Sequence, residues 1–147
     1  MSIALAADFD TIFEEKDKSK RYAGKLSYQS AGEPVSIDIE LEVRGNFRVG
    51  HCQVSGLRVF FPKGVDGVFK GQKKLKLVTQ CRSSSTLYQD YVLQEYAVYR
   101  AYQALTDKSF ATRLALVNYL DMGKDNAWTN YAFFRSEEHT SELQSPD

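Results

Sequence analysis

The sequence predicts an α+β fold, in which a largely antiparallel β-sheet carries one long helix packed on one face. Residues 35–44 alternate apolar and polar side chains over five periods, as a half-buried strand does. Residues 87–105 repeat apolar side chains at helical spacing, and residues 113–134 hold two strand-like runs around a turn. The order of strands, one helix and a terminal hairpin favours a sheet with a helix layer.

The first predicted strand covers residues 3–7, whose odd positions are apolar. The tripeptide Ala4-Leu5-Ala6 also has the small-x-small form of a signal-peptidase site, but no basic region and no apolar core precede it. No intact signal peptide is therefore expected in this chain. Residues 8–20 begin apolar and become charged, which indicates a helical turn or a loop.

A hairpin is predicted next. Residues 22–30 alternate weakly and lead into the turn signal at residues 31–34, and the regular alternation of residues 35–44 supplies the second strand.

Two short strands flank a glycine-containing loop. Residues 57–61 form the first and are closed by Pro62, residues 63–72 form the loop, and residues 74–79 form the second strand.

One long helix is predicted over residues 87–105, because Ser83–Thr86 supplies N-cap chemistry ahead of apolar residues at 3.6-residue spacing. Its face toward the sheet is expected to centre on the stripe of Leu87, Tyr91, Val98, Tyr102 and Leu105, and Tyr88, Val92 and Tyr99 are expected to widen this apolar side. The tyrosines of this segment are more typical of core residues with a wet hydroxyl end than of a base-stacking surface. Residues 113–121 and 128–134 form the terminal hairpin around a turn at residues 122–126.

The chain is expected to be a single domain over residues 1–134, the N-terminal fragment of a larger protein. Residues 135–145, RSEEHTSELQS, resemble the in-frame translation of a sequencing-library adapter, so residues 135–147 are expected to be an artefactual, disordered tail. The alternative is an ordinary polar C-terminal tail. The formal net charge of the whole chain is zero, but residues 1–134 carry 18 basic and 15 acidic residues, a net charge of +3.

Several function classes are excluded by composition. No stretch approaches 18 apolar residues, so no transmembrane segment is expected. The small net charge argues against a nucleic-acid binder. His51 is the single histidine of residues 1–134, and no G-x-S-x-G motif is present, so no Ser-His-Asp set can be built.

A basic block between Arg44 and Lys76 is the first candidate site. It has a net charge of +7 over 33 residues and consists of Arg44, Arg48, Arg58, Lys63, Lys70, Lys73, Lys74 and Lys76 against Asp66. An anionic ligand such as a phosphate is one interpretation, and the glycines of the loop could bring backbone N–H groups close to it. The other is a solvated face that pairs with the acidic stripe of residues 38–42.

Glu95 is the second candidate, since it lies within the apolar stripe of the helix, where a charge needs a partner. Lys74 or Lys76 on the preceding strand could supply that partner. A strand lysine and a helix glutamate are the groups with which kinases hold ATP phosphates. The alternative is a glutamate at the edge of the stripe with a structural or solvent partner.

The two cysteines, Cys52 and Cys81, allow two interpretations. They could form a disulfide, which would indicate an oxidising compartment, or they could be two free buried thiols. Together with His51 they are too few for a zinc site, so no metal centre is expected.

Several motifs resemble those of a family of uncharacterised, exported bacterial proteins. They are Val43-Arg44-Gly45-Asn46, Cys52, Leu57-Arg58-Val59-Phe60-Phe61, Gly71-Gln72, Lys74-Leu75-Lys76-Leu77-Val78-Thr79, Cys81, Gln94-Glu95-Tyr96 and Tyr119-x-Asp121. The family is in turn distantly similar to the spore-coat CotH-like atypical kinases. The resemblance implies an extracytoplasmic (periplasmic or secreted) location and a protein substrate.

The kinase similarity implies roles for individual residues. Arg44, Gly45 and Asn46 would form the motif turn, and Lys74 or Lys76 would pair with Glu95 over the phosphates of ATP. The catalytic and Mg²⁺-binding residues would lie beyond Phe134, so ATP and Mg²⁺ are expected only for a full-length enzyme, and the fragment is expected to be inactive.

The rival hypothesis is a non-enzymatic extracytoplasmic binding module, which uses its basic face for an acidic partner or an envelope polymer.

Overall fold

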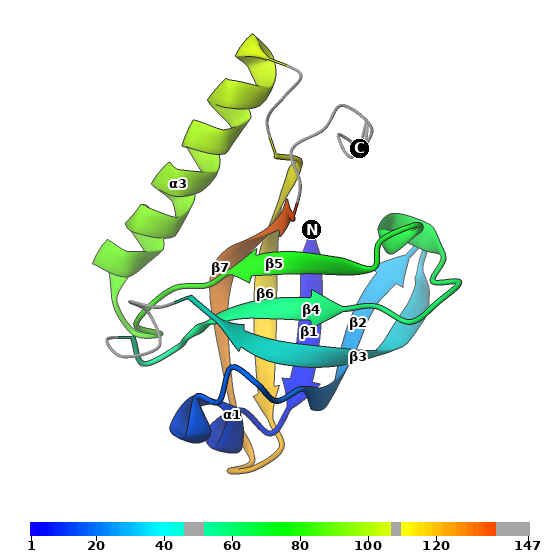
Figure 1. Ribbon diagram of the computed structural model, residues 1–147, viewed down its shortest axis with the longest axis vertical. Helices are drawn as coiled ribbons and strands as arrows, with labels where there is room; N and C mark the ends of the chain where they lie inside the picture. Colours follow the sequence, from blue (N-terminus) through cyan, green and yellow to red (C-terminus); the bar gives the residue numbers. More distant parts are fainter. Residues whose placement is uncertain (46–51, 107–109, 138–147) are drawn as a thin grey trace.

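The computed structural model describes residues 1–45, 52–106 and 110–137. Its elements are β1 (Ser2–Ala7), α1 (Phe9–Glu15), β2 (Tyr22–Ser30), β3 (Glu33–Arg44), β4 (Gly56–Phe60), the 3₁₀-helix η1 (Gly67–Phe69), β5 (Lys74–Val78), α3 (Thr86–Leu105), β6 (Thr112–Asp121) and β7 (Asn126–Ser136) (Figure 1).

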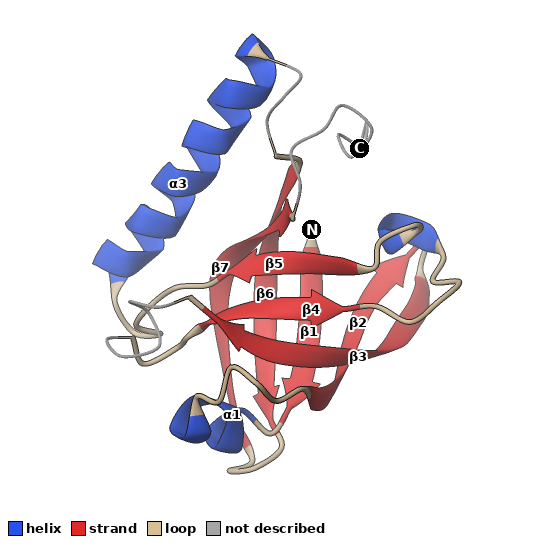
Figure 2. Cartoon of the chain, in the orientation of Figure 1, coloured by secondary structure: helices blue, strands red, loops and turns tan. Residues whose placement is uncertain are grey.

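Within these residues the strands close into one seven-stranded β-barrel in the order β1-β2-β3-β4-β5-β7-β6 (Figure 2). The expected α+β sheet, with a long helix packed on one face, is therefore wrong. The barrel closes because β1 pairs antiparallel with β2 and parallel with β6, with Ser2 opposite Leu116 and Ala7 opposite Asp121.

The strands close into a barrel because apolar and polar side chains alternate along them, and the apolar side chains of all the strands point into one shared interior. On β3 these are Ile37, Ile39, Leu41 and Val43, all at most 7% exposed. The other strands contribute fully buried residues to the same core, among them Leu5, Leu26, Leu57, Leu77, Val117 and Ala132. The sheet thus buries its apolar face against itself, and it needs no helix to cover that face.

The positions of the predicted strands are confirmed to within two residues at each end. The turn of the first hairpin is also where the sequence predicts it. Ala31 and Gly32 have positive φ angles of 52° and 81°, as a two-residue hairpin turn of type I′ requires. Residues 9–15, within the predicted turn or loop at 8–20, form the helix α1.

The long helix begins where its cap predicts, since the Ser85 side chain accepts a hydrogen bond from the Tyr88 amide at 3.4 Å. It lies outside the barrel (Figure 1). The stripe on which the predicted face centres is instead exposed, by between 50% and 85% of each residue: Leu87, Tyr91, Val98, Tyr102 and Leu105. That part of the prediction is wrong.

The edge of the predicted apolar side that holds Val92 and Tyr99, together with Tyr96, contacts the barrel. Val92 packs with Val78 of β5 and Phe133 of β7, and the rings of Tyr96 and Tyr99 lie 5.7 and 5.8 Å from that of Phe133. These contacts form a small second core on the outer surface of the sheet.

β7 runs two residues past the domain boundary expected at Phe134. Arg135 pairs with Lys76 and Thr112, and Ser136 pairs with Leu75. Residues 135 and 136 are thus part of the barrel, whereas most of the expected tail lies outside the described residues. The adapter origin of residues 135–147 stays a prediction. None of the described helices combines the length and apolar character needed to cross a membrane.

Candidate anion-binding site

Four basic side chains converge on the outer surface of the barrel from four adjacent strands. We call them the outer basic cluster: Arg44 of β3, Arg58 of β4, Lys76 of β5 and Arg135 of β7. The pairing places Arg58 beside Lys76 and Lys76 beside Arg135. Directly paired residues in an antiparallel sheet have Cβ atoms about 5 Å apart, so the register concentrates positive charge here.

Arg58 is held between two carboxylates. Its Nη1 donates to Glu42 Oε1 at 2.6 Å and its Nε donates to Glu137 Oε1 at 2.7 Å. The hydrogen bond to Glu137 raises the pKa of Arg58, and the bond to Glu42 adds to this against the opposing effect of burial. Lys76 is more loosely placed, with Nζ 4.0 Å from Glu137 Oε2.

Arg44 has no such partner. Its side chain folds over Gly56, where a Cβ atom would lie 3.1 Å from Arg44 Nη1. Burial lowers the pKa of Arg44, and the positive charges of Arg135 and Arg58 lower it further. Within the described residues no hydrogen bond or ion pair reaches this guanidinium. Burial without a counterion is unfavourable for an arginine, and an added anion would relieve it.

Arg135 is also without a counterion among the described residues, although it is only 8% exposed. Its guanidinium carbon lies 4.0 Å from the ring centroid of Phe110 and 5.5 Å from that of Tyr99, so aromatic faces support it. Burial lowers the pKa of Lys76. The positive charges of Arg135 and Arg44 lower it further, because they lie close to the Lys76 ammonium group. The cluster holds four cations against the carboxylates of Glu42 and Glu137.

The predicted pair of a strand lysine with Glu95 is not formed. Glu95 is exposed on α3, and among the described residues no ion pair joins it to Lys74 or Lys76. The negative charge of Glu95 raises the pKa of Arg44 slightly, but burial and the neighbouring arginines lower that pKa more. The motif turn is described only in part: Gly45 has a φ of 91°, which favours glycine, and Asn46 lies outside the described residues.

The basic block of the sequence separates into two parts. Arg44, Arg58 and Lys76 join the outer basic cluster, while Arg48 lies outside the described residues. The remaining lysines are exposed: Lys63, Lys70, Lys73 and Lys74. All but Lys74 belong to the loop between β4 and β5, at the end of these strands away from α3 (Figure 1).

This loop does not bring its glycine backbone to the cluster. Its amides close turns within the loop, with Lys70 N donating to Gly67 O at 3.1 Å and Gln72 N to Phe69 O at 3.0 Å. Together with the β2–β3 hairpin, the loop borders an open cavity of about 510 Å³. Its lining is largely apolar and includes Tyr28, Val35, Ile37, Pro62 and Val65.

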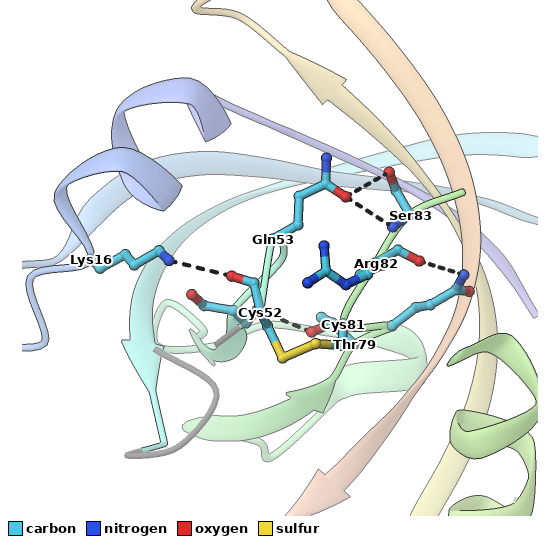
Figure 3. Close-up of a disulfide and its surroundings, with 9 residues drawn as sticks. Lys16, Cys52, Gln53, Thr79, Cys81, Arg82 and Ser83 are labelled. Atoms are coloured by element: carbon cyan, nitrogen blue, oxygen red, sulfur yellow. Dashed lines mark hydrogen bonds between the residues drawn. A yellow bond between two sulfur atoms is a disulfide. The ribbon is translucent and has the colours of Figure 1, made fainter. Parts of the chain in front are cut away.

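The two cysteines form a disulfide, with the Cα atoms of Cys52 and Cys81 4.8 Å apart (Figure 3). The alternative of two free thiols is wrong. Lys16 Nζ donates to Cys52 O at 3.3 Å, and the Ser83 amide donates to Gln53 Oε1 at 3.3 Å. The crosslink fixes the segment before β4 to the segment that leads into α3.

Two residues at this site, Arg135 and Glu137, belong to the segment that is expected to be translated adapter, so the sequence analysis includes neither of them among the candidates. The available signal was the strand pattern, since residues 131–136 continue the run of β7 without a turn. Within the described residues no group of three or more His, Cys, Asp or Glu side chains could hold a metal ion. Comparisons of the chain with protein-family models, with curated proteins and with solved structures found no match.

Proposed function

We propose that this barrel is a non-enzymatic binding module, whose outer basic cluster holds an anionic group of a partner. The observation that carries the proposal is Arg44, a half-buried guanidinium that has no counterion among the described residues and lies beside Arg58 and Arg135. A bound anion would offset the repulsion between these cations and the loss of hydration.

An extracytoplasmic location is part of the same proposal. The Cys52–Cys81 disulfide supports it, since structural disulfides persist in oxidising compartments. A role in phosphoryl transfer has no comparable support, because the lysine–Glu95 pair on which it depends is not formed among the described residues. ATP and Mg²⁺ binding by a longer protein stays a prediction of the kinase resemblance.

Binding of short polyanions tests the proposal. Fluorescence anisotropy would follow a labelled hexaglutamate peptide and, by competition, inorganic polyphosphate. Arg44→Gln is expected to weaken binding by about 10- to 150-fold, since a charge-assisted hydrogen bond contributes about 1.5–3 kcal/mol. Binding should also weaken as ionic strength rises.

Lys70→Gln is the matched control, because it removes the same charge from an exposed position in the β4–β5 loop. Equal losses for the two variants would mean that only net charge matters, and the assigned site would be wrong. Absence of binding to both polyanions by the wild-type protein would contradict the function itself.

A further inference from the structure

The first half of β3 has a strand neighbour on only one side among the described residues. β2 pairs with β3 as far as their shared turn, whereas the pairing of β4 with β3 stops where Phe60 lies opposite Glu40. Pro62 follows β4 and has no N–H group with which to continue this ladder. Prolines within sheets are confined to such edges, and Pro34 lies in the same stretch of β3. Residues 34–39 therefore form an open edge within the barrel.

The unpaired backbone groups of this edge point away from β2. Phe61 N donates to Lys73 O at 2.8 Å, so the Phe61 backbone faces β5, and that of Phe60 faces β3 because backbone direction alternates along a strand. The same alternation directs the N–H and C=O groups of Ser36 and Asp38 toward the side on which β4 lies. Within the described residues no hydrogen bond reaches these four groups.

A largely apolar groove lies beside this edge. It is the open cavity of about 510 Å³, which is bordered by residues 35–38 of β3 and residues 62–67 of the β4–β5 loop. Val35 and Ile37 line it from the inward-facing positions of β3, and Val65 lines it from the loop. The groove therefore combines unpaired backbone groups with apolar side chains at alternate positions of one strand.

We propose that this groove binds an extended peptide segment of a partner protein, which adds a strand to the open edge of β3 in line with β4. An extended chain is the occupant that pairs with N–H and C=O groups repeating every 7 Å or so along a strand, about two residues apart. Ser36 and Asp38 hold the peptide backbone, and apolar peptide side chains opposite Val35 and Ile37 enter the groove. The groove lies at the opposite end of β3 from Arg44, so this site is independent of the proposed function.

Fluorescence anisotropy of the full chain with a labelled pentapeptide, Lys-Val-Thr-Val-Lys, tests this inference. In line with β4, the valines of the peptide lie opposite Val35 and Ile37, its threonine opposite Ser36 and its first lysine opposite Asp38. Methylation of the threonine backbone nitrogen removes an N–H group that faces β3, so binding should weaken at least about fivefold. Methylation of one valine nitrogen is the matched control. That N–H group points away from β3, so the affinity should change by less than about twofold.

Ser36→Pro tests the edge from the protein side. It removes a backbone N–H group that no described residue accepts, so the barrel loses no hydrogen bond, but binding of the pentapeptide should weaken at least about fivefold. Ser36→Ala keeps the N–H group and is the matched control, with an affinity within about twofold of the wild type. Thermal melts establish that both variants are folded. If Ser36→Pro is unfolded, the two methylated peptides decide the question with the wild-type protein.

Four results would contradict the binding of a partner strand at β3. The first is absence of pentapeptide binding by the wild type. The second is equal binding of the two methylated peptides, which would mean that the groove takes apolar side chains without pairing the backbone. The third is equal binding by folded Ser36→Pro and Ser36→Ala. The fourth is a wild-type dimer that Ser36→Pro makes monomeric in sedimentation, since a second copy of the chain would then occupy the edge.

Discussion

Arg58 determines how charge is shared within the outer basic cluster, because its guanidinium reaches both Glu42 and Glu137. A guanidinium offers several N–H donors in a fixed planar fork, so it can serve two carboxylates at once. Arg44 projects from β3 beside it and receives neither carboxylate. Among the residues that the structure describes, Arg44 is therefore the arginine beside Arg58 whose charge an anion could offset without displacing a carboxylate.

Gly67 and Gly64 provide a matched test of side-chain space at the β4–β5 loop. Both have a φ of 75°, but a Cβ at Gly67 would lie 2.7 Å from Tyr28 Oη, whereas at Gly64 nothing lies within 4 Å. Gly64→Ala should cost about 1 kcal/mol in free energy of unfolding, from the left-handed backbone. Gly67→Ala should cost about 1–3 kcal/mol more, from the overlap with a buried tyrosine. Urea denaturation measures both.

The control for this pair is Tyr28→Phe, which removes the hydroxyl that a new Cβ would meet. In the Tyr28→Phe background, the difference between the two alanine variants should shrink. A difference that persists unchanged would mean that Tyr28 Oη is not its source.

The helix α3 shows what an element's sequence can and cannot specify. Its N-cap serine and its 3.6-residue periodicity predicted its position almost to the residue. The predicted face centres on the wrong stripe because two apolar stripes adjoin: Val92, Tyr96 and Tyr99 form the buried one, and Leu87 and Val98 belong to the exposed one. Which stripe is buried depends on the surface that β5 and β7 present, and periodicity within the helix carries no information about that surface.

Val92 and Val98 measure the difference between these two stripes with the same substitution. Val92 is 4% exposed and Val98 is 56% exposed, on one helix. Val92→Ala should lower the free energy of unfolding by about 1–3 kcal/mol, and Val98→Ala should change it by less than about 0.5 kcal/mol. Helix propensity changes equally in both, so it cancels in the comparison. Equal effects in urea denaturation would contradict the observed orientation of α3.

The disulfide should contribute to stability through the loop it closes. Cys52 and Cys81 are 29 residues apart in sequence, a loop for which chain entropy predicts about 3–4 kcal/mol. The double variant Cys52→Ser/Cys81→Ser should unfold at a correspondingly lower urea concentration, and reductant should shift the wild type but not the variant. Free thiols detected in denatured, unreduced wild-type protein would contradict the crosslink.

At the scale of the whole molecule, the alternation of apolar residues predicted which face of each strand is buried but not which strands are neighbours. Nothing in residues 3–7 indicates that β1 pairs in parallel with β6, more than 100 residues later, and this pairing is what closes the barrel. The site shares this dependence on topology. Arg44 and Lys76 were singled out from the sequence, but they meet Arg135 only because β7 lies next to β5.

Closure of the barrel can be tested at β1 with proline, which removes a backbone donor. Ala7 faces β6, since its carbonyl accepts a hydrogen bond from the Met122 amide at 2.8 Å, and Ala4, three residues away, faces β2. In an open sheet with β1 at its edge, proline would be tolerated at one of the two positions. In the closed barrel, Ala4→Pro and Ala7→Pro should each lower the free energy of unfolding by about 2 kcal/mol or more in urea denaturation.

Ala4→Gly and Ala7→Gly keep the N–H group and serve as controls for the lost methyl group and the added backbone freedom. If only one proline variant were destabilised beyond its glycine control, β1 would have a free edge and the barrel would be open between β1 and the strand on the tolerated side.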